Sequence, residues 1–206
     1  MFQMENPIQN LISILNASHH PIELEVKPEP NTKPNDCLNI VKRKVESDGG
    51  KMVLGWQIWK TQYWVEAEFH AVWEDLNLEL HDISPKAIPI KKILFVEDEK
   101  LTYDGTQKES IRLNYSNNQF VDDLFKVWEA IFRFDNKGER KFLYDLSSVL
   151  NHDQLEYKKY LINLKQIIEY ILKLNGNRNS NCPCNSGIEF HSCHGKDFDI
   201  KVSLDI

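Results

Sequence analysis

The C-terminal segment holds the residues whose types and spacing are best suited to chemistry. Cys182, Cys184 and Cys193 are three of the four cysteines, and His194 completes a C-x-C-x8-C-H pattern. Two close ligand pairs joined by a short loop suit a tetrahedral Zn²⁺ ion held by three thiolates and one imidazole. A segment this short cannot form a core, so metal binding would supply its folding free energy. The alternatives are a disulfide or a chance cluster of cysteines.

This segment resembles the SEC-C motif, the zinc-binding knuckle at the end of SecA-type translocase motors and of many otherwise unrelated bacterial proteins. The resemblance covers about 178–195. It implies one structural zinc ion, with His191 as a competing histidine off the motif position. The ligands that it implies are Cys182, Cys184, Cys193 and His194.

The segment departs from the family at two places. Asn185 stands at the family's glycine, and asparagine tolerates left-handed backbone geometry. The family's basic run is replaced by residues 188–192, Ile-Glu-Phe-His-Ser, which keep only the aromatic residue. In relatives the knuckle can dock a partner such as a chaperone or the ribosome. The missing lysines make an acidic or RNA surface a less suitable partner here.

A second group of reactive residue types lies in the N-terminal half. Cys37 follows Asn35 and Asp36, either of which could cap a helix, so we expect the thiol in a first helical turn. Unpaired N–H groups and the helix dipole favour a thiolate at that place. Residues 64–73 alternate as a half-buried strand does, and they place His70 on the face opposite Phe69.

A hairpin would bring His70 close to a carboxylate. If the chain turns near Leu76, Trp73 pairs with Glu79 and His70 pairs with Asp82. Directly opposed residues have Cβ atoms ~5 Å apart. The pattern therefore predicts a nucleophile, a base and an orienting group in Cys37, His70 and Asp82.

Residues 31–85, with the strings FHAVWED and LHDISP, resemble the papain-like superfamily, in particular transglutaminase-like domains. There a Cys helix packs on a sheet whose neighbouring strands carry the His and the Asp. The resemblance implies that Cys37 is the nucleophile, His70 the base and Asp82 the orienting group. Asn31, six residues before Cys37, would donate to an oxyanion as the Gln of papain-like proteases does.

Structural roles for the same residues stay open. A lone cysteine on a helix is often part of a core, and a histidine on a polar strand face is often solvated. Glu66 and Glu68 share the face of His70, where they could form an exposed edge or line a cleft that selects a cationic substrate. With His70 they could also bind a second metal ion.

The surrounding elements indicate an α+β fold with an antiparallel sheet. Helical stripes predict helices at 7–16, 37–48, 120–131 and 153–174, and further strands are expected at 22–26, 78–83, 93–96 and 111–115. The expected domains are a papain/transglutaminase-like α+β domain at 1–116, a helical extension at 117–176, the zinc motif at 177–196 and a terminal strand at 197–206. That last strand would close the protein's own sheet or pair with a partner's.

Composition limits the function classes. The net charge of −6 argues against nucleic-acid binding and against anionic membranes. The chain has no apolar run of ~20 residues, which a membrane span requires. The start, MFQMENPIQN, is too polar for a signal peptide, so we expect a cytoplasmic protein with reduced cysteines.

Two functions follow from these patterns. The first is a zinc-binding protein with a Cys-His-Asp acyl-transfer site, of the peptidase, amidase or transglutaminase type, that acts on a peptide substrate. The alternative is a non-enzymatic adaptor that docks a protein partner through the zinc knuckle and the terminal strand.

Overall fold

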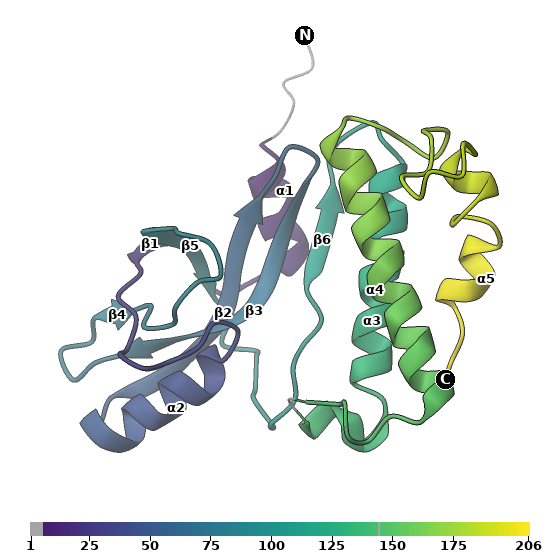
Figure 1. Ribbon diagram of the computed structural model, residues 1–206. Helices are drawn as coiled ribbons and strands as arrows, with labels where there is room; N and C mark the ends of the chain where they lie inside the picture. Colours follow the sequence, from purple (N-terminus) through teal and green to yellow (C-terminus); the bar gives the residue numbers. More distant parts are fainter. Residues whose placement is uncertain (1–5, 144) are drawn as a thin grey trace, which may run out of the picture. The chain divides into compact units, whose positions relative to one another are not determined.

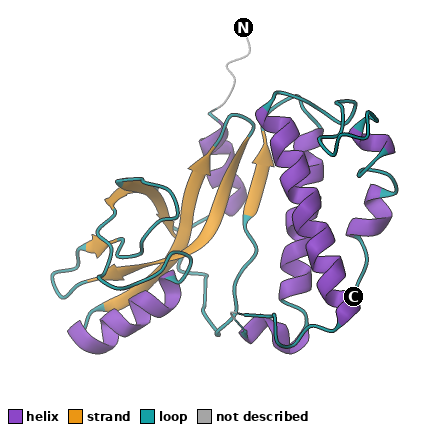
Figure 2. Cartoon of the chain, in the orientation of Figure 1, coloured by secondary structure: helices purple, strands orange, loops and turns teal. Residues whose placement is uncertain are grey.

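The computed structural model describes residues 6–143 and 145–206, which form two compact units. The first unit contains the chain up to Asp104 together with Lys108–Leu113, and the second contains Gly105–Gln107 and Asn114–Ile206. Strands build the first unit, whereas the second is mainly helical (Figure 2). The expectation of a mixed α+β protein with an antiparallel sheet is confirmed.

The first unit is a curled antiparallel sheet with two helices (Figure 1). Its elements are α1 (Pro7–Leu15), β1 (Ile22–Glu25), α2 (Cys37–Asp48), β2 (Lys51–Lys60), β3 (Trp64–Glu74), β4 (Leu80–His81), β5 (Lys92–Glu97) and β6 (Ile111–Asn114). The strand order is β1-β5-β2-β3-β4, and β6 also pairs with β3. A parallel bridge between Val26 and Asp82 joins the two ends of this order, so the sheet nearly closes into a barrel.

The central strand β3 is buried on both faces. On one face it packs with α1 and α2 in a core that includes Leu11 and Leu38. On the other face Val72 packs with Phe95 of β5. The alternation in sequence predicts correctly which residues share a face, but it also predicts that one face is solvated. Because the sheet curls over that face, His70 is buried.

The register of the β3–β4 hairpin differs from the expectation by two residues. Trp73 pairs with His81 instead of Glu79. Asp75 explains the difference, because its carboxylate accepts the backbone N–H groups of Asn77 at 2.8 Å and of Glu79 at 2.9 Å. This side-chain turn moves the centre of the hairpin from Leu76 toward the next residue.

The second unit is built on two long helices that lie side by side in opposite directions (Figure 1). Its elements are α3 (Phe120–Asp135), the 3-10 turn Gly138–Phe142, α4 (His152–Lys173), the 3-10 turn Phe190–Ser192 and α5 (Phe198–Val202). A capping box of Asn151 and Gln154 starts α4, and its apolar stripe is buried. No helix within the described residues is both long and apolar enough to cross a membrane.

The prediction of a C-terminal strand at 197–206 is wrong, because Phe198–Val202 form the short helix α5. The alternating pattern is ambiguous over so few residues, since positions i and i+4 share a face in a helix as well as in a strand. Phe198 and Val202 are buried at 7% and 6% exposure, whereas Ile200 is 67% exposed. A strand would have placed all three on one face.

Two charge substitutions in α5 distinguish the helix from a strand. Val202→Asp should lower the free energy of unfolding of the second unit by about 2–4 kcal/mol, because it buries a carboxylate. Ile200→Asp should change it by less than about 0.5 kcal/mol, because that side chain lies in water. Urea unfolding of the metal-loaded protein, followed by circular dichroism at the α-helical band, measures both, since most of the helical residues lie in the second unit. Equal losses in the two variants would contradict the helix.

Candidate functional site

The four residues of the C-terminal pattern lie together. Their ligand atoms are all within 4.8 Å of one another, and they belong to Cys182, Cys184, Cys193 and His194. Cys182 Sγ is 3.1 Å from His194 Nδ1, and Cys184 Sγ is 3.5 Å from Cys193 Sγ. Tetrahedral bonds of ~2.0–2.3 Å to zinc would separate such atoms by roughly 3.5–3.8 Å. The cluster therefore fits a metal ion held by three sulfur atoms and one nitrogen.

A tight turn brings the two ligand pairs together. The backbone N–H of Cys182 donates to the carbonyl of Ile188 at 2.9 Å, which closes the turn. Within the turn Asn185 has φ 62° and Gly187 has φ 72°. Both positions require left-handed backbone, which asparagine and glycine adopt at the lowest cost. Asn185 can therefore stand in for the family's glycine.

The Cys/His loop, residues 180–195, is anchored to α3. The ring of Phe190 is buried and contacts Phe120 edge to face, with ring centroids 4.9 Å apart. Just before the loop, Arg178 forms a bidentate ion pair with the buried carboxylate of Asp123. Gly195 permits the close approach of Phe190, because a Cβ there would meet that ring at 2.6 Å. The metal site is thus attached to the helical pair at two points.

His191 lies outside the metal cluster. Its Nδ1 is 3.3 Å from a carboxylate oxygen of Glu189, at the surface. Inside the cluster, the hydroxyl of Ser186 lies 3.3 Å from Cys184 Sγ and helps to lower the pKa of this thiol to about 6. Burial raises the pKa of Cys182. Deprotonation of both thiols is required for metal binding, so binding would release protons.

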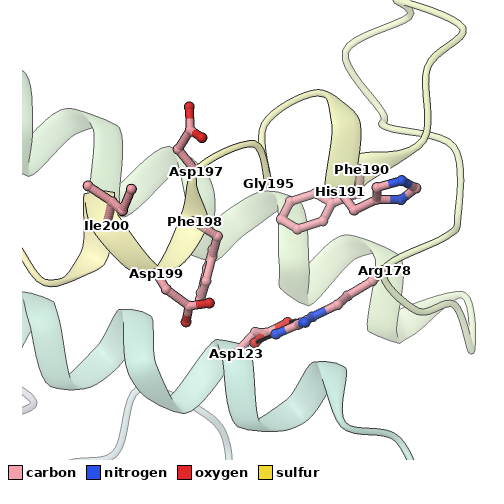
Figure 3. A pocket seen from close by; sticks show the side chains of 9 residues that line it. All are labelled: Asp123, Arg178, Phe190, His191, Gly195, Asp197, Phe198, Asp199 and Ile200. Carbon is pink, nitrogen blue, oxygen red and sulfur yellow. Dashed lines mark hydrogen bonds and ion pairs between the residues drawn. The ribbon is translucent and has the colours of Figure 1, made fainter.

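A hollow of about 330 Å³ lies beside the Cys/His loop, lined also by α3 and α5 (Figure 3). Asp123 and Arg178 lie along one wall, and the carboxylate of Asp199 points toward them, whereas that of Asp197 points away. The charges at the hollow are largely paired, because Arg178 pairs with Asp123 and Lys126 lies 2.7 Å from a carboxylate oxygen of Asp199.

In the first unit, Cys37 is the first residue of α2, as the sequence predicts. Its thiol is half-buried and lines the same cavity as His70, close enough for each group to shift the pKa of the other. The positive end of the helix dipole lies at the same place. The thiol therefore has both a base and a source of positive potential beside it.

The structure brings His70 and Asp82 together through a different register from the expected one. His70 Nε2 is 3.1 Å from Asp82 Oδ1, and the two side chains are 5% and 0% exposed. In the observed register Asp82 lies diagonally across from His70, on the same face, because a shift of two residues preserves the face. The bridge to Val26 and a hydrogen bond of 2.8 Å from the N–H of Lys27 to the Asp82 carbonyl fix its backbone.

A glycine allows the imidazole to be covered. Gly55 of β2 lies directly opposite His70. A Cβ at Gly55 would meet the ring of Phe95 at 2.5 Å and the carbonyl oxygen of Val96 at 2.2 Å. Without that atom, the ring of Phe95 packs edge-on against His70 with centroids 6.4 Å apart. The close approach of β5 thus removes the imidazole from water.

Lys86 belongs to this group, although the sequence reasoning missed it. Its Nζ is 2.7 Å from Asp82 Oδ2, 2.9 Å from Gln57 Oε1 and 3.2 Å from His70 Nε2. The side chain is 8% exposed. Lys86 lies in an irregular segment, where no periodicity points inward. Its spacing of four residues from Asp82 is the signal that could have drawn attention to it.

These groups shift one another's pKa values. Burial alone would lower the pKa of His70, but Asp82 and Cys37 raise it to about 9. Burial alone would raise the pKa of Cys37, but the hydrogen bond and charge of His70 outweigh burial and lower it. Burial would likewise raise the pKa of Asp82, and His70 with Lys86 reverse that shift. The arrangement favours a thiolate–imidazolium pair.

Cys37 and His70 line a cavity of about 90 Å³. Asn31, which was expected to bind an oxyanion, lies outside this lining in an exposed turn, whereas Asn35 is part of it. The expectation placed the amide four residues too early in the chain, because the loop turns again at Asn35 before α2 begins. Ser84 also lines the cavity.

Glu66 and Glu68 have separate partners. Glu66 pairs with Arg112 at 2.9 Å, and Glu68 accepts the indole N–H of Trp59 at 2.6 Å. Among the described residues these carboxylates do not gather with His70 into a set of metal ligands. The second metal site is therefore not supported, whereas Glu68 does line the cavity beside Cys37.

The charge coupling between Cys37 and His70 can be measured directly. Cys37→Ala should lower the pKa of His70 from about 9 by about one unit or more, because a negative neighbour that favours the imidazolium is removed. Histidine ring NMR over a pH series, assigned with His70→Gln, gives the value. Glu66→Gln is the matched control, since it removes a carboxylate on the same face without changing the thiol. A His70 pKa that is the same with and without the thiol would contradict the coupling.

Comparison with protein families matches residues 178–196 to the SEC-C motif. No curated protein and no solved structure matches the chain. The resemblance of residues 31–85 to papain-like and transglutaminase-like domains is therefore not confirmed. The chain carries a SEC-C motif at its C-terminal end, and the Cys/His cluster found there has the geometry of a metal site.

Proposed function

We propose that the Cys/His loop binds one structural zinc ion and that the first unit is a cysteine-dependent acyl-transfer enzyme. The zinc assignment is supported by the ligand set, since three thiolates and one imidazole at tetrahedral spacing favour zinc over magnesium or calcium. Four protein ligands leave no open coordination position. Such a site stabilises a fold and does not activate water.

Metal analysis tests this assignment. The purified chain should hold about one zinc ion, and Cys193→Ser should lower the zinc content and destabilise the second unit, because a ligand is lost. Cys37→Ser is the matched control, which should keep about one zinc ion per chain. A zinc content that does not respond to Cys193→Ser would contradict the site, and two ions per chain would contradict a single one.

The observation that supports acyl transfer is that Cys37 and His70 line one cavity while Asp82 holds the His70 ring. Asp82 engages Nε2 of the ring at 3.1 Å, which leaves Nδ1 as the nitrogen available to the thiol. A base oriented by a buried carboxylate is the arrangement that activates a thiol nucleophile. A core cysteine would require neither the base nor the carboxylate.

The chemistry follows from these positions. The Cys37 thiolate would attack a carbonyl carbon to form a tetrahedral oxyanion. The His70 imidazolium would then give its proton to the leaving amine as the C–N bond breaks, which yields a thioester on Cys37. Water or a second amine, deprotonated by neutral His70, would attack this thioester, and the thiolate would leave and be restored.

Two groups beside Cys37 could stabilise the oxyanion. The first-turn N–H groups of α2 carry the positive end of the helix dipole. The hydroxyl of Ser84 is buried in the cavity wall, and among the described residues it has no hydrogen-bond partner. A buried hydroxyl without a partner is costly, and a substrate oxygen would satisfy it.

The substrate class that fits best is a peptide or another amide. A cavity of about 90 Å³ accommodates the reacting group and little more, so the remainder of the substrate would lie outside it. The Glu68 carboxylate in the cavity wall favours a cationic group near the reacting carbonyl. The resemblance to transglutaminase-like domains is in keeping with this class.

Thiol alkylation tests the nucleophile in the zinc-loaded protein, where metal protects the other three cysteines. Iodoacetamide at pH 6.5 should modify Cys37 about tenfold faster than an ordinary thiol. An unperturbed thiol is only about 1% ionised there, and the lower nucleophilicity of a low-pKa thiolate offsets part of the gain. His70→Gln should remove this advantage, whereas His81→Gln, in the neighbouring strand β4, should preserve it. Peptide mass spectrometry locates the label.

The same experiment separates the enzyme from the second candidate function, an adaptor that docks a protein partner. The hollow beside the Cys/His loop favours that candidate, because it offers a concave surface next to the metal cluster. A Cys37 that reacts as slowly as a free thiol, with or without His70, would overturn the enzyme and leave the adaptor. Docking by a terminal strand is no longer part of that candidate, since the segment is helical.

A further inference from the structure

Lys86 is the charged group in the thiol site to which the proposed reaction assigns no step. A lysine is rarely buried without a partner, because removal of an ammonium from water costs several kcal/mol. The contacts of Lys86 are to Asp82, His70 and Gln57, and two of these belong to the proposed triad. Its location therefore requires an explanation within the site.

Lys86 neutralises the charge on the carboxylate oxygen of Asp82 that His70 does not contact. His70 engages Oδ1, whereas Oδ2 is buried and, among the described residues, receives no hydrogen bond of good angular geometry. The ammonium of Lys86 lies 2.7 Å from Oδ2, so it stabilises this oxygen through its charge. Asp82 is thus held from both sides, by a ring nitrogen and by an ammonium.

The contact of Lys86 with His70 destabilises the protonated ring, whereas the contact of Asp82 with His70 stabilises it. An ammonium has three donors and no acceptor, so it can interact favourably with Nε2 only when that nitrogen carries no proton. Asp82, in contrast, favours a protonated Nε2. At a separation of 3.2 Å, Lys86 therefore works against the imidazolium that Asp82 and Cys37 stabilise. The lowering of the pKa of His70 by the Lys86 charge agrees with this reasoning.

The charges of the triad of Cys37, His70 and Asp82 balance only when Lys86 is counted. A thiolate, an imidazolium and a carboxylate sum to a net negative charge, and the ammonium brings the sum to zero. The other groups around the ring are the neutral Gln57 on β2 and the ring of Phe95 on β5. The charge of Glu68 acts on Cys37, and the charge of Cys37 acts on Tyr103, but neither Glu68 nor Tyr103 is among the groups that shift the pKa of His70.

We propose that Lys86 is a positioning residue of the thiol site, which holds the Asp82 carboxylate in place and, through its positive charge beside the ring, helps the His70 imidazolium to release the Nδ1 proton that faces the thiol. This inference rests on the proposed acyl transfer for its functional meaning. A proton acceptor that binds its proton too tightly is a poor acid toward the leaving amine. Lys86 would keep the proton of His70 available for that step while Asp82 keeps the ring oriented.

The test is the pKa of His70 in variants of Lys86, measured by histidine ring NMR on the zinc-loaded full chain. Lys86→Gln keeps a hydrogen-bond donor and removes the charge, and it should raise the pKa of His70 by about one unit or more. Lys86→Arg keeps the charge and should restore a value near that of the unchanged protein. Lys92→Gln, at an exposed site on β5, controls for the change in net charge and should have no effect.

The outcomes separate a positioning role from a structural one. An unchanged His70 pKa in Lys86→Gln, even with reduced stability, would overturn the proposal, and so would a rise that Lys86→Arg fails to reverse. If Lys86→Gln does not fold, Lys86→Met, which is close in volume and has no polar group, provides the same comparison. The NMR readout does not depend on turnover or on alkylation of Cys37. It therefore tests Lys86 even if the acyl-transfer function fails.

Discussion

The Asp82 carboxylate is the constraint on which the first unit depends. A fully buried carboxylate is tolerated only when opposite charges and hydrogen-bond donors surround it. Here the backbone of Asp82 bridges β1 and β4, while its side chain engages His70 of β3 and Lys86 of the following segment. One side chain thus ties together the near-closure of the sheet and the orientation of the imidazole. The fold and the site depend on the same residue.

This dependence explains why the sheet curls. An open sheet would leave the His70 face of β3 in water, where an imidazole–carboxylate pair contributes little. Closure by Val26 and cover by Phe95 place the pair at low dielectric, where charges act strongly on one another. Burial of this charged pair costs free energy, which a protein that required only a stable core would not need to spend. Apolar residues at these positions would have been more stabilising.

The sequence predicted what depends on local periodicity. Alternation in β3 assigned the faces of His70 and Phe69 correctly, and the Cys37 helix begins where its cap residues indicate. The predicted hairpin register was wrong because the carboxylate of Asp75 forms a turn that cannot be predicted from the pattern of hydrophobic residues. Lys86 was missed for a related reason. Its partners are fixed by how an irregular segment folds back on the sheet, which periodicity does not describe.

The two sites divide the four cysteines in a way that bears on their chemistry. A Cys3His metal site uses all of its protein ligands to close the coordination sphere, so it offers neither an open position nor a free thiolate. Cys37 is the cysteine left outside that set, and it lies in the other unit, where it lines a cavity together with the buried His70. A bound metal ion would thus stabilise the loop around Phe190 and also remove three competing thiols. Thiol reactivity in the metal-loaded protein would then belong to Cys37 alone.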